Sequence, residues 1–230
     1  MNSFIVQLKT LCASHPTRTK WVVVPTHAMG RMMGDRLALD GTNWANLRCV
    51  TPLDLALRMG APFLVEQGID PSEEGLGPAL MMRLLMERPE GQGYFRPLAD
   101  QPQMAIALWS TLRELRMAGV RAIDIGAATF ASPAKHDELT ALVEAYELFL
   151  ASNNRGDRAT VFAEALHHSD WCPVQAGDCW IGWPDTIWSV LERRLIERLP
   201  GERIVCPVSS PPDVEVPRRL KSLAGVSSPA

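Results

Sequence analysis

Lysine is scarce in this chain, and the few lysines present exclude two kinds of catalytic site. The 230 residues contain only four of them, Lys9, Lys20, Lys135 and Lys221. None follows a glycine, whereas a Walker A loop needs Gly-Lys-Ser/Thr so that the lysine reaches the β- and γ-phosphates from a glycine-rich turn. None has an acidic residue two positions before it, as metal-dependent nucleases of the PD-(D/E)xK type require. This sequence therefore has neither a nucleotide-binding loop nor that nuclease site.

Paired cysteines and long apolar runs are also missing. The five cysteines are odd in number and no two have CxxC spacing, which argues against a zinc ribbon and against a disulfide scaffold. Residues 1–20 lack the apolar core of a signal peptide, and no run approaches roughly 18 apolar residues. We therefore expect no membrane span and no metal site, and a reducing cytoplasm as the location.

The charge of the chain limits how it can bind nucleic acid. Its formal net charge is -3, so no global positive field attracts nucleic acid, and any such surface must be a local patch. Nearly all of the basic residues are arginine, which suits contacts with phosphates and base edges. A compositional bias of the source is the simpler explanation of the arginine excess.

The first 60 residues predict alternating strands and helices. Residues 21–24 form an apolar run that ends at Pro25, as in a buried parallel strand, and Thr26 can cap a following helix. Residues 47–50 form a second short strand, after which Thr51 and a proline open another helix. This order is a βαβ unit, in which the crossover is right-handed.

The rest of the chain predicts a helical segment inside an α/β core. Residues 72–169 contain four helical patterns and no strand, strands return at 179–182 and 203–206, and residues 186–199 form a helix between them. The predicted domains are a discontinuous core (1–71 with 170–207), a helical insertion (72–169) and a Pro/Ser-rich tail or linker (208–230). The predicted fold is α/β, with a three-layer core around a parallel sheet of four or more strands.

Several segments resemble one family when they are taken in order. WVVVPTHAMGRMMGDRL looks like the strand and helix after the nucleotide loop of UvrD/Rep-type superfamily-one helicases, and RCVTPLDLALRM looks like their next strand-plus-threonine motif. WSTLRELRMAGV and KHDELTALVEAYELFLASNNRGDRATVFAEAL are similar to the inserted 1B-type helical subdomain. CWIGWPDTIWSVLERRLIERLPGERIVCPV resembles the segment that resumes the core sheet. The resemblance is strongest to the degenerate AddB-type subunits of bacterial helicase-nucleases.

The resemblance implies a DNA-contacting domain without a motor. It implies a P-loop-NTPase-like sheet that lacks the P-loop, in a DNA repair and recombination protein of the PD-(D/E)XK nuclease family. By position it nominates Thr26, His27, Arg31 and Thr51 as DNA-binding residues, with single-stranded DNA and a helicase or nuclease subunit as partners. It implies no catalytic residue and no cofactor in this chain, because the motor and nuclease motifs are missing.

Simpler explanations remain open for each of these residues. Thr26 and Thr51 are plausible helix caps, and Arg31 can belong to a solvated helix face. His167 and His168, with nearby cysteines, resemble metal ligands, but adjacent side chains on a helix do not converge on one ion. The tryptophans of residues 171–188 favour core packing over base stacking. Two other functions stay possible, namely a small α/β hydrolase or transferase and a protein–protein interaction module without a DNA role.

Overall fold

A four-stranded parallel sheet is the centre of the computed structural model, which describes residues 2–87 and 93–205. Its strands are β1 (Lys20–Val23), β2 (Leu47–Val50), β3 (Cys179–Gly182) and β4 (Glu202–Ile204). They lie in the order β2-β1-β3-β4, and every neighbouring pair is parallel. The predicted α/β class with a four-stranded parallel sheet is therefore confirmed, with β1 starting one residue earlier than expected. Cys206, which we assigned to the last strand, lies outside the described residues.

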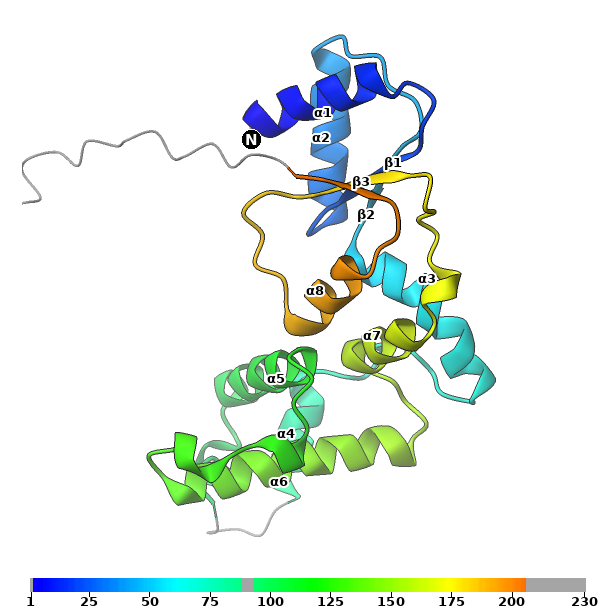
Figure 1. Cartoon of the computed structure of the whole chain (residues 1–230). Helices are drawn as coiled ribbons and strands as arrows, with labels where there is room; N and C mark the ends of the chain where they lie inside the picture. The colour runs from blue at the N-terminus through cyan, green and yellow to red at the C-terminus, as the bar shows by residue number, and fades with distance from the viewer. Residues whose placement is uncertain (1, 88–92, 206–230) are drawn as a thin grey trace, which may run out of the picture.

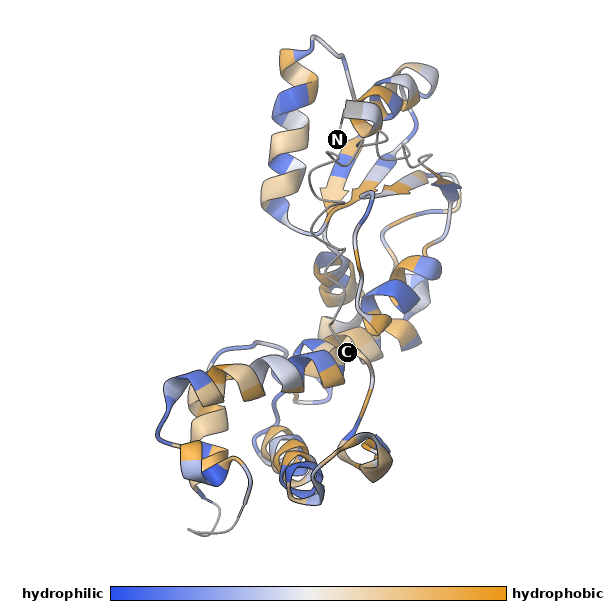
Figure 2. Ribbon diagram, turned by 90° about the vertical axis from the view of Figure 1, so that its left-hand side faces the viewer, coloured by the Kyte–Doolittle hydropathy of each residue, from blue (hydrophilic) through white to orange (hydrophobic). Residues whose placement is uncertain are grey.

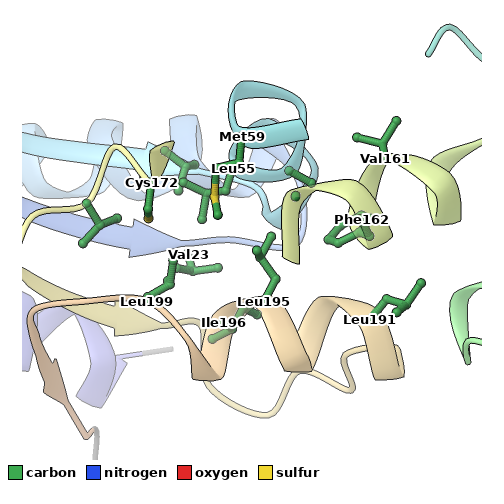
Figure 3. Packing of buried hydrophobic residues seen from close by; sticks show 14 of the residues in the cluster. Val23, Leu55, Met59, Val161, Phe162, Cys172, Leu191, Leu195, Ile196 and Leu199 are labelled. Atoms are coloured by element: carbon green, nitrogen blue, oxygen red, sulfur yellow. The ribbon is translucent and has the colours of Figure 1, made fainter. Parts of the chain in front are cut away.

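Helices cover both faces of this sheet because the central strands are apolar on both sides. Val22 and Val24 pack against α1 (Asn2–Ser14) and α2 (His27–Leu39). On the opposite face Trp21 and Val23 belong to a cluster with residues of three other helices. These helices are α3 (Pro52–Glu66), α7 (Arg158–His167) and α8 (Val190–Glu197). Figure 1 shows α1 and α2 on one side of the strands and α3 and α8 on the other, and Figure 3 shows this second cluster from close by.

Side-chain caps set where the helices around the sheet begin. Thr26 caps α2, Thr51 caps α3 and Ser189 caps α8, each by accepting a hydrogen bond from a backbone N–H in the first turn. The prediction for the last of these helices was too long, because we expected it to start at Thr186. The chain instead passes through Asp185 at a φ of 56°, outside the helical region, and Ser189 and Glu192 then form a capping box.

Three helices between the α/β segments form a hydrophobic cluster of their own. They are α4 (Pro78–Met86), α5 (Pro102–Met117) and α6 (Pro133–Ser152). Their buried residues, which include Met81, Leu112 and Tyr146, pack on one another, and Figure 1 places these helices away from the sheet. Helix α7 follows them in sequence but packs along α3. Its Phe162 belongs to the cluster of Trp21 and Val23 on the α3 and α8 face of the sheet, here called the cluster beneath the sheet. The predicted domain limits, at 71/72 and 169/170, remain a prediction.

The helices combine hydrophobic and hydrophilic residues, as Figure 2 shows by colour. Hydrophobic residues on α3 and α8 meet the sheet, while charged residues of the same helices stay exposed. In the ranges that the structure describes, no helix has both the length and the apolar character needed to cross a membrane.

Candidate nucleic-acid interface

The carboxyl ends of the parallel strands place several polar residues along one edge of the sheet. Ligands of open parallel sheets bind at this edge, where chain segments leave neighbouring strands in opposite directions. Strand β1 leads into Thr26, and the adjacent β2 leads into Thr51. On its other side β1 pairs with β3, which leads into Trp183 and Asp185. The chain after β1 turns to the α2 face and the chain after β3 to the α8 face, so the edge between them is such a switch point.

Thr26 is exposed at the start of α2. Its Oγ1 accepts a hydrogen bond of 3.3 Å from the Met29 backbone N–H, which confirms that Thr26 caps this helix. The first amides of a helix, here those of His27 and Ala28, have no acceptor within the helix. A helix N-terminus with free amides and a positive dipole end favours an anionic group such as a phosphate.

Thr51 is buried and its hydroxyl is engaged within the protein. Its Oγ1 accepts from the Asp54 backbone N–H at 3.2 Å and donates to Asp54 Oδ2 at 2.9 Å. The Thr51 backbone N–H also donates to Asp54 Oδ2, at 2.8 Å. Thr51 is thus the cap of α3, as one of our two interpretations expected, and only 8% of its surface is exposed. Its hydroxyl holds the start of α3 in place and is not free to bind a ligand.

His27 connects the starts of the two helices. Its Nε2 lies 3.3 Å from Asp54 Oδ1, and 64% of its side chain is exposed. His27 and Thr51 therefore meet through a shared carboxylate. This is not a Ser-His-Asp type of catalytic group, because the Thr51 hydroxyl donates to the carboxylate instead of to the imidazole. The arrangement orients an exposed imidazole beside the N-terminus of α2.

Arg31 lies one turn beyond His27 and faces an open hollow. The hollow has a volume of about 550 Å³ between α1, α2 and the segment after β3. Its lining is mostly apolar, with Met32, Leu39 and Trp183, but it also includes Asp35 and Arg36. Met32 and Leu39 are 45% and 82% exposed. Within residues 2–87 and 93–205, Arg31 has no carboxylate at ion-pair distance, whereas Arg36 pairs with Asp40. Arg31 is therefore a cation available to an external anion.

The structure thus brings together only part of the predicted site. Thr26 and His27 are adjacent, His27 and Thr51 share Asp54, and Arg31 is on the same helix but lines a hollow towards α1. Asp54 was not predicted from the sequence, although the Thr-x-x-Asp spacing of a capping box marks it. The shared position of Arg31 and Trp183 at one hollow was not predicted either, since it depends on the folding of distant segments.

The residues that resemble metal ligands have other roles. His168 stacks on Phe63 with 3.4 Å between ring centroids, and its Nε2 lies 3.0 Å from Glu164 Oε1. Cys172 is buried in the cluster beneath the sheet. The described part of the chain contains no group of three His, Cys, Asp or Glu residues placed to hold a metal ion.

The tryptophans that follow have different environments. Trp180 is buried with the Arg203 guanidinium 5.3 Å from its ring centroid, and Trp183 packs against Phe4 at 5.1 Å. Trp188 is partly buried against the cluster beneath the sheet, whereas Trp171 is 58% exposed. Of these four, only Trp183 lines the hollow that Arg31 faces.

The capping role of Thr51 gives a first testable prediction. Thr51→Val keeps the shape of the side chain but removes both hydroxyl hydrogen bonds, so we expect the free energy of unfolding to fall by about 1–2 kcal/mol. Thr51→Ser keeps the hydroxyl and serves as the control. Urea denaturation followed by circular dichroism measures both variants. Equal stability of Thr51→Val and the unchanged protein would contradict the capping role.

Comparison with known proteins identifies no relative of this chain. No model of a protein family matches the chain, and no curated protein is significantly similar to it in sequence. Any function must therefore be argued from the residues themselves.

Proposed function

We propose that this chain is a non-catalytic, helicase-like domain that contacts single-stranded DNA. The observation that carries the proposal is the exposed N-terminus of α2 beside Arg31. Arg31 has no carboxylate at ion-pair distance in the described ranges, and it faces a hollow whose lining is mostly apolar but includes Asp35 and Arg36. Proteins that bind single strands combine cations for the phosphates with apolar or aromatic surfaces for the bases. Phosphates would bind Thr26, the free amides and Arg31, and bases would lie against Met32 and Trp183.

The positions of the lysines support a role without ATP hydrolysis. Lys20 is fully buried, and its Nζ donates to the backbone oxygens of His15 and Arg18. Lys9 pairs with Asp40 at 2.8 Å, and Lys135 lies 6.0 Å from the ring centroid of Tyr94. Each of the three described lysines is thus engaged elsewhere than at the carboxyl edge of the sheet. The resemblance places the nucleotide loop before β1, and residues 2–19, which precede this strand, contain no glycine to form a loop around a phosphate.

The proposal also covers the finer architecture and the biological setting. We interpret the sheet with helices on both faces as a P-loop-NTPase-like core without its P-loop, and α4 to α6 as the centre of an inserted subdomain. Their separate hydrophobic cluster supports this interpretation. The parent protein would be a bacterial repair nuclease that acts in the cytoplasm, and the four free cysteines among the described residues suit a reducing compartment.

Exposed apolar residues support a protein partner in addition to DNA. Ile187, between β3 and α8, is 99% exposed, and Leu39 at the end of α2 is 82% exposed. A helicase or nuclease subunit would cover such residues in a complex. They also favour the alternative that the chain is a protein–protein interaction module with no DNA role, in which case the DNA experiment below gives no binding.

The proposal predicts salt-dependent binding of a single DNA strand that depends on Arg31. We expect Arg31→Ala to weaken binding about tenfold at low salt, as for the loss of one charged hydrogen bond. The slope of log affinity against log salt should become shallower by about 0.7, the value for one phosphate contact on a single strand. Fluorescence anisotropy with a labelled oligothymidine measures both quantities.

The matched control is Arg83→Ala on α4, which removes the same charge from an exposed site where the arginine pairs with Glu87 at 3.3 Å. It should bind like the unchanged protein. An absence of binding by the unchanged protein at low salt would refute the DNA role. An equal loss in both variants would mean that net charge alone matters, and Arg31 would not mark the site.

A further inference from the structure

A second groove, on the opposite face of the sheet from Arg31, is lined by basic side chains. It lies between the end of α5, α7 and α8 and has a volume of about 680 Å³. Its basic residues, here called the arginine groove, are Arg116, Arg121, His167, Arg194 and Arg198. No Asp or Glu is among the residues that line it. Leu166 and Leu191 provide an apolar surface between the basic side chains.

The charges of the arginine groove are only partly neutralised. Arg116 pairs with Asp157 at 3.0 Å and Glu147 at 3.2 Å, and the exposed Arg121 lies 3.5 Å from Asp124. Arg194 and Arg198 have no carboxylate partner within the described ranges. Arg198 Nη1 donates to the Leu166 backbone oxygen at 3.0 Å, which orients its guanidinium at the end of α7. Arg194 and Arg198, at the end of α8, thus place two positive charges without a carboxylate partner in one groove.

The chemistry of the arginine groove favours a phosphate chain over a single small anion. A guanidinium matches the geometry of a phosphate with two parallel N–H donors. A volume of about 680 Å³ is within the range of sites that enclose organic ligands, so several groups can lie in it together. Its apolar surface between the cations suits the sugars of a nucleotide chain.

We propose that the arginine groove binds the phosphate backbone of a nucleic-acid strand, as a second contact surface besides the N-terminus of α2. This inference rests on the proposed DNA role for the class of ligand but uses other residues. An acidic protein segment is the competing occupant, and the experiment includes it.

The test compares two double variants that remove the same charge. Arg194→Gln with Arg198→Gln alters the arginine groove, whereas Arg193→Gln with Arg83→Gln alters exposed arginines that do not line it. With the full chain and a labelled oligothymidine, the groove variant should bind about a hundredfold more weakly, because two charged contacts are lost. Its salt slope should be shallower by about 1.4, for two phosphates. The control should keep the affinity of the unchanged protein.

The outcomes separate this inference from the proposed function. Loss of binding in Arg31→Ala but not in the groove variant would keep the proposed function and overturn the groove. The reverse result would support the groove and overturn the site at α2. Equal loss in the control pair, no DNA binding at all, or tighter binding of labelled polyglutamate through Arg194 would each overturn the groove. Since Arg198 also holds the end of α7, Arg194→Gln alone is the second variant, and thermal melting checks that it is folded.

Discussion

Replacing Gly60 with valine is expected to lower the free energy of unfolding by about 3 kcal/mol, because α3 and α7 touch at this residue. A Cβ atom at Gly60 would lie 2.8 Å from the Ala165 backbone nitrogen and 2.8 Å from the Val161 backbone oxygen. These are helix backbone atoms, which cannot rotate away as a side chain can. The two helices would have to separate, which would open the cluster that contains Met59 and Phe162 (Figure 3).

Thermal melting by circular dichroism measures this effect, and a loss of about 3 kcal/mol corresponds to roughly 6–12 °C for a chain of this size. Gly34→Val is the matched control. Gly34 also lies inside a helix, but a Cβ atom there has no neighbour within 4 Å. We expect it to change the stability by less than about 0.5 kcal/mol. Equal melting temperatures for the two variants would show that α3 and α7 do not pack this closely.

The sequence predicted the elements whose patterns are local. Strands β1 and β3 are short apolar runs close to a proline, and Thr26 and Thr51 are caps at the points where a strand leads into a helix. The predicted start of α8, at residue 186, was wrong. Ile187 is 99% exposed and precedes the cap at Ser189, so the first residues of the predicted helix have no buried face.

The features that depend on distant segments could not be predicted. The contact of His27 with Asp54 depends on the pairing of β1 with β2, because this pairing sets the starts of α2 and α3 side by side. The arginine groove collects side chains from α5, α7 and α8, and no motif in the sequence connects Arg116 with Arg194. The need for glycine at position 60 is likewise not visible in the neighbouring sequence, since it arises only where α3 crosses α7.

A buried ion pair connects the three helices α5, α6 and α7. Asp157 begins α7, where its carboxylate accepts from the Thr160 backbone N–H at 2.8 Å and from Arg116 Nε at 3.0 Å. Arg116 also donates to Glu147 Oε1 at 3.2 Å, and the Tyr146 hydroxyl donates to Asp157. Only 17% of the Arg116 side chain and 7% of the Asp157 side chain are exposed. Asp157 therefore depends on Arg116 for compensation of its charge, whereas Arg116 is also compensated by Glu147.

Burial and pairing act in opposite directions on these groups. Burial tends to raise the pKa of Asp157, but the hydrogen bond and charge of Arg116, with the bonds from Thr160, outweigh it and hold the pKa below its usual value. For Tyr146, burial and then the charge of Asp157 raise the pKa. A lowered pKa of Asp157 stabilises the fold above about pH 4, the unfolded value, and this contribution is lost as the pH falls through the folded pKa.

Arg116→Met should therefore lower the free energy of unfolding at pH 7 by about 3–5 kcal/mol, the cost of leaving a buried charge unpaired. We expect the pKa of Asp157 to rise in this variant, because burial, the largest effect on it, is then opposed only by the hydrogen bonds from Thr160. The unpaired Asp157 carboxylate would then destabilise the fold at pH 7, and its protonation at lower pH would remove the buried charge. The difference in stability between the variant and the unchanged protein should shrink between pH 7 and pH 4, as measured by urea denaturation at each pH.

Two further variants separate charge pairing from simple loss of an arginine. Arg121→Met removes an exposed arginine that is 3.5 Å from Asp124, and surface pairs of this kind contribute no more than about 1 kcal/mol. Arg116→Met combined with Asp157→Asn removes both charges and keeps a residue that can cap α7, so it should recover part of the lost stability. A double variant less stable than Arg116→Met alone would contradict the charge argument. The stability would then depend on the packing of the arginine stem between α5 and α7, and the pH dependence would be absent as well.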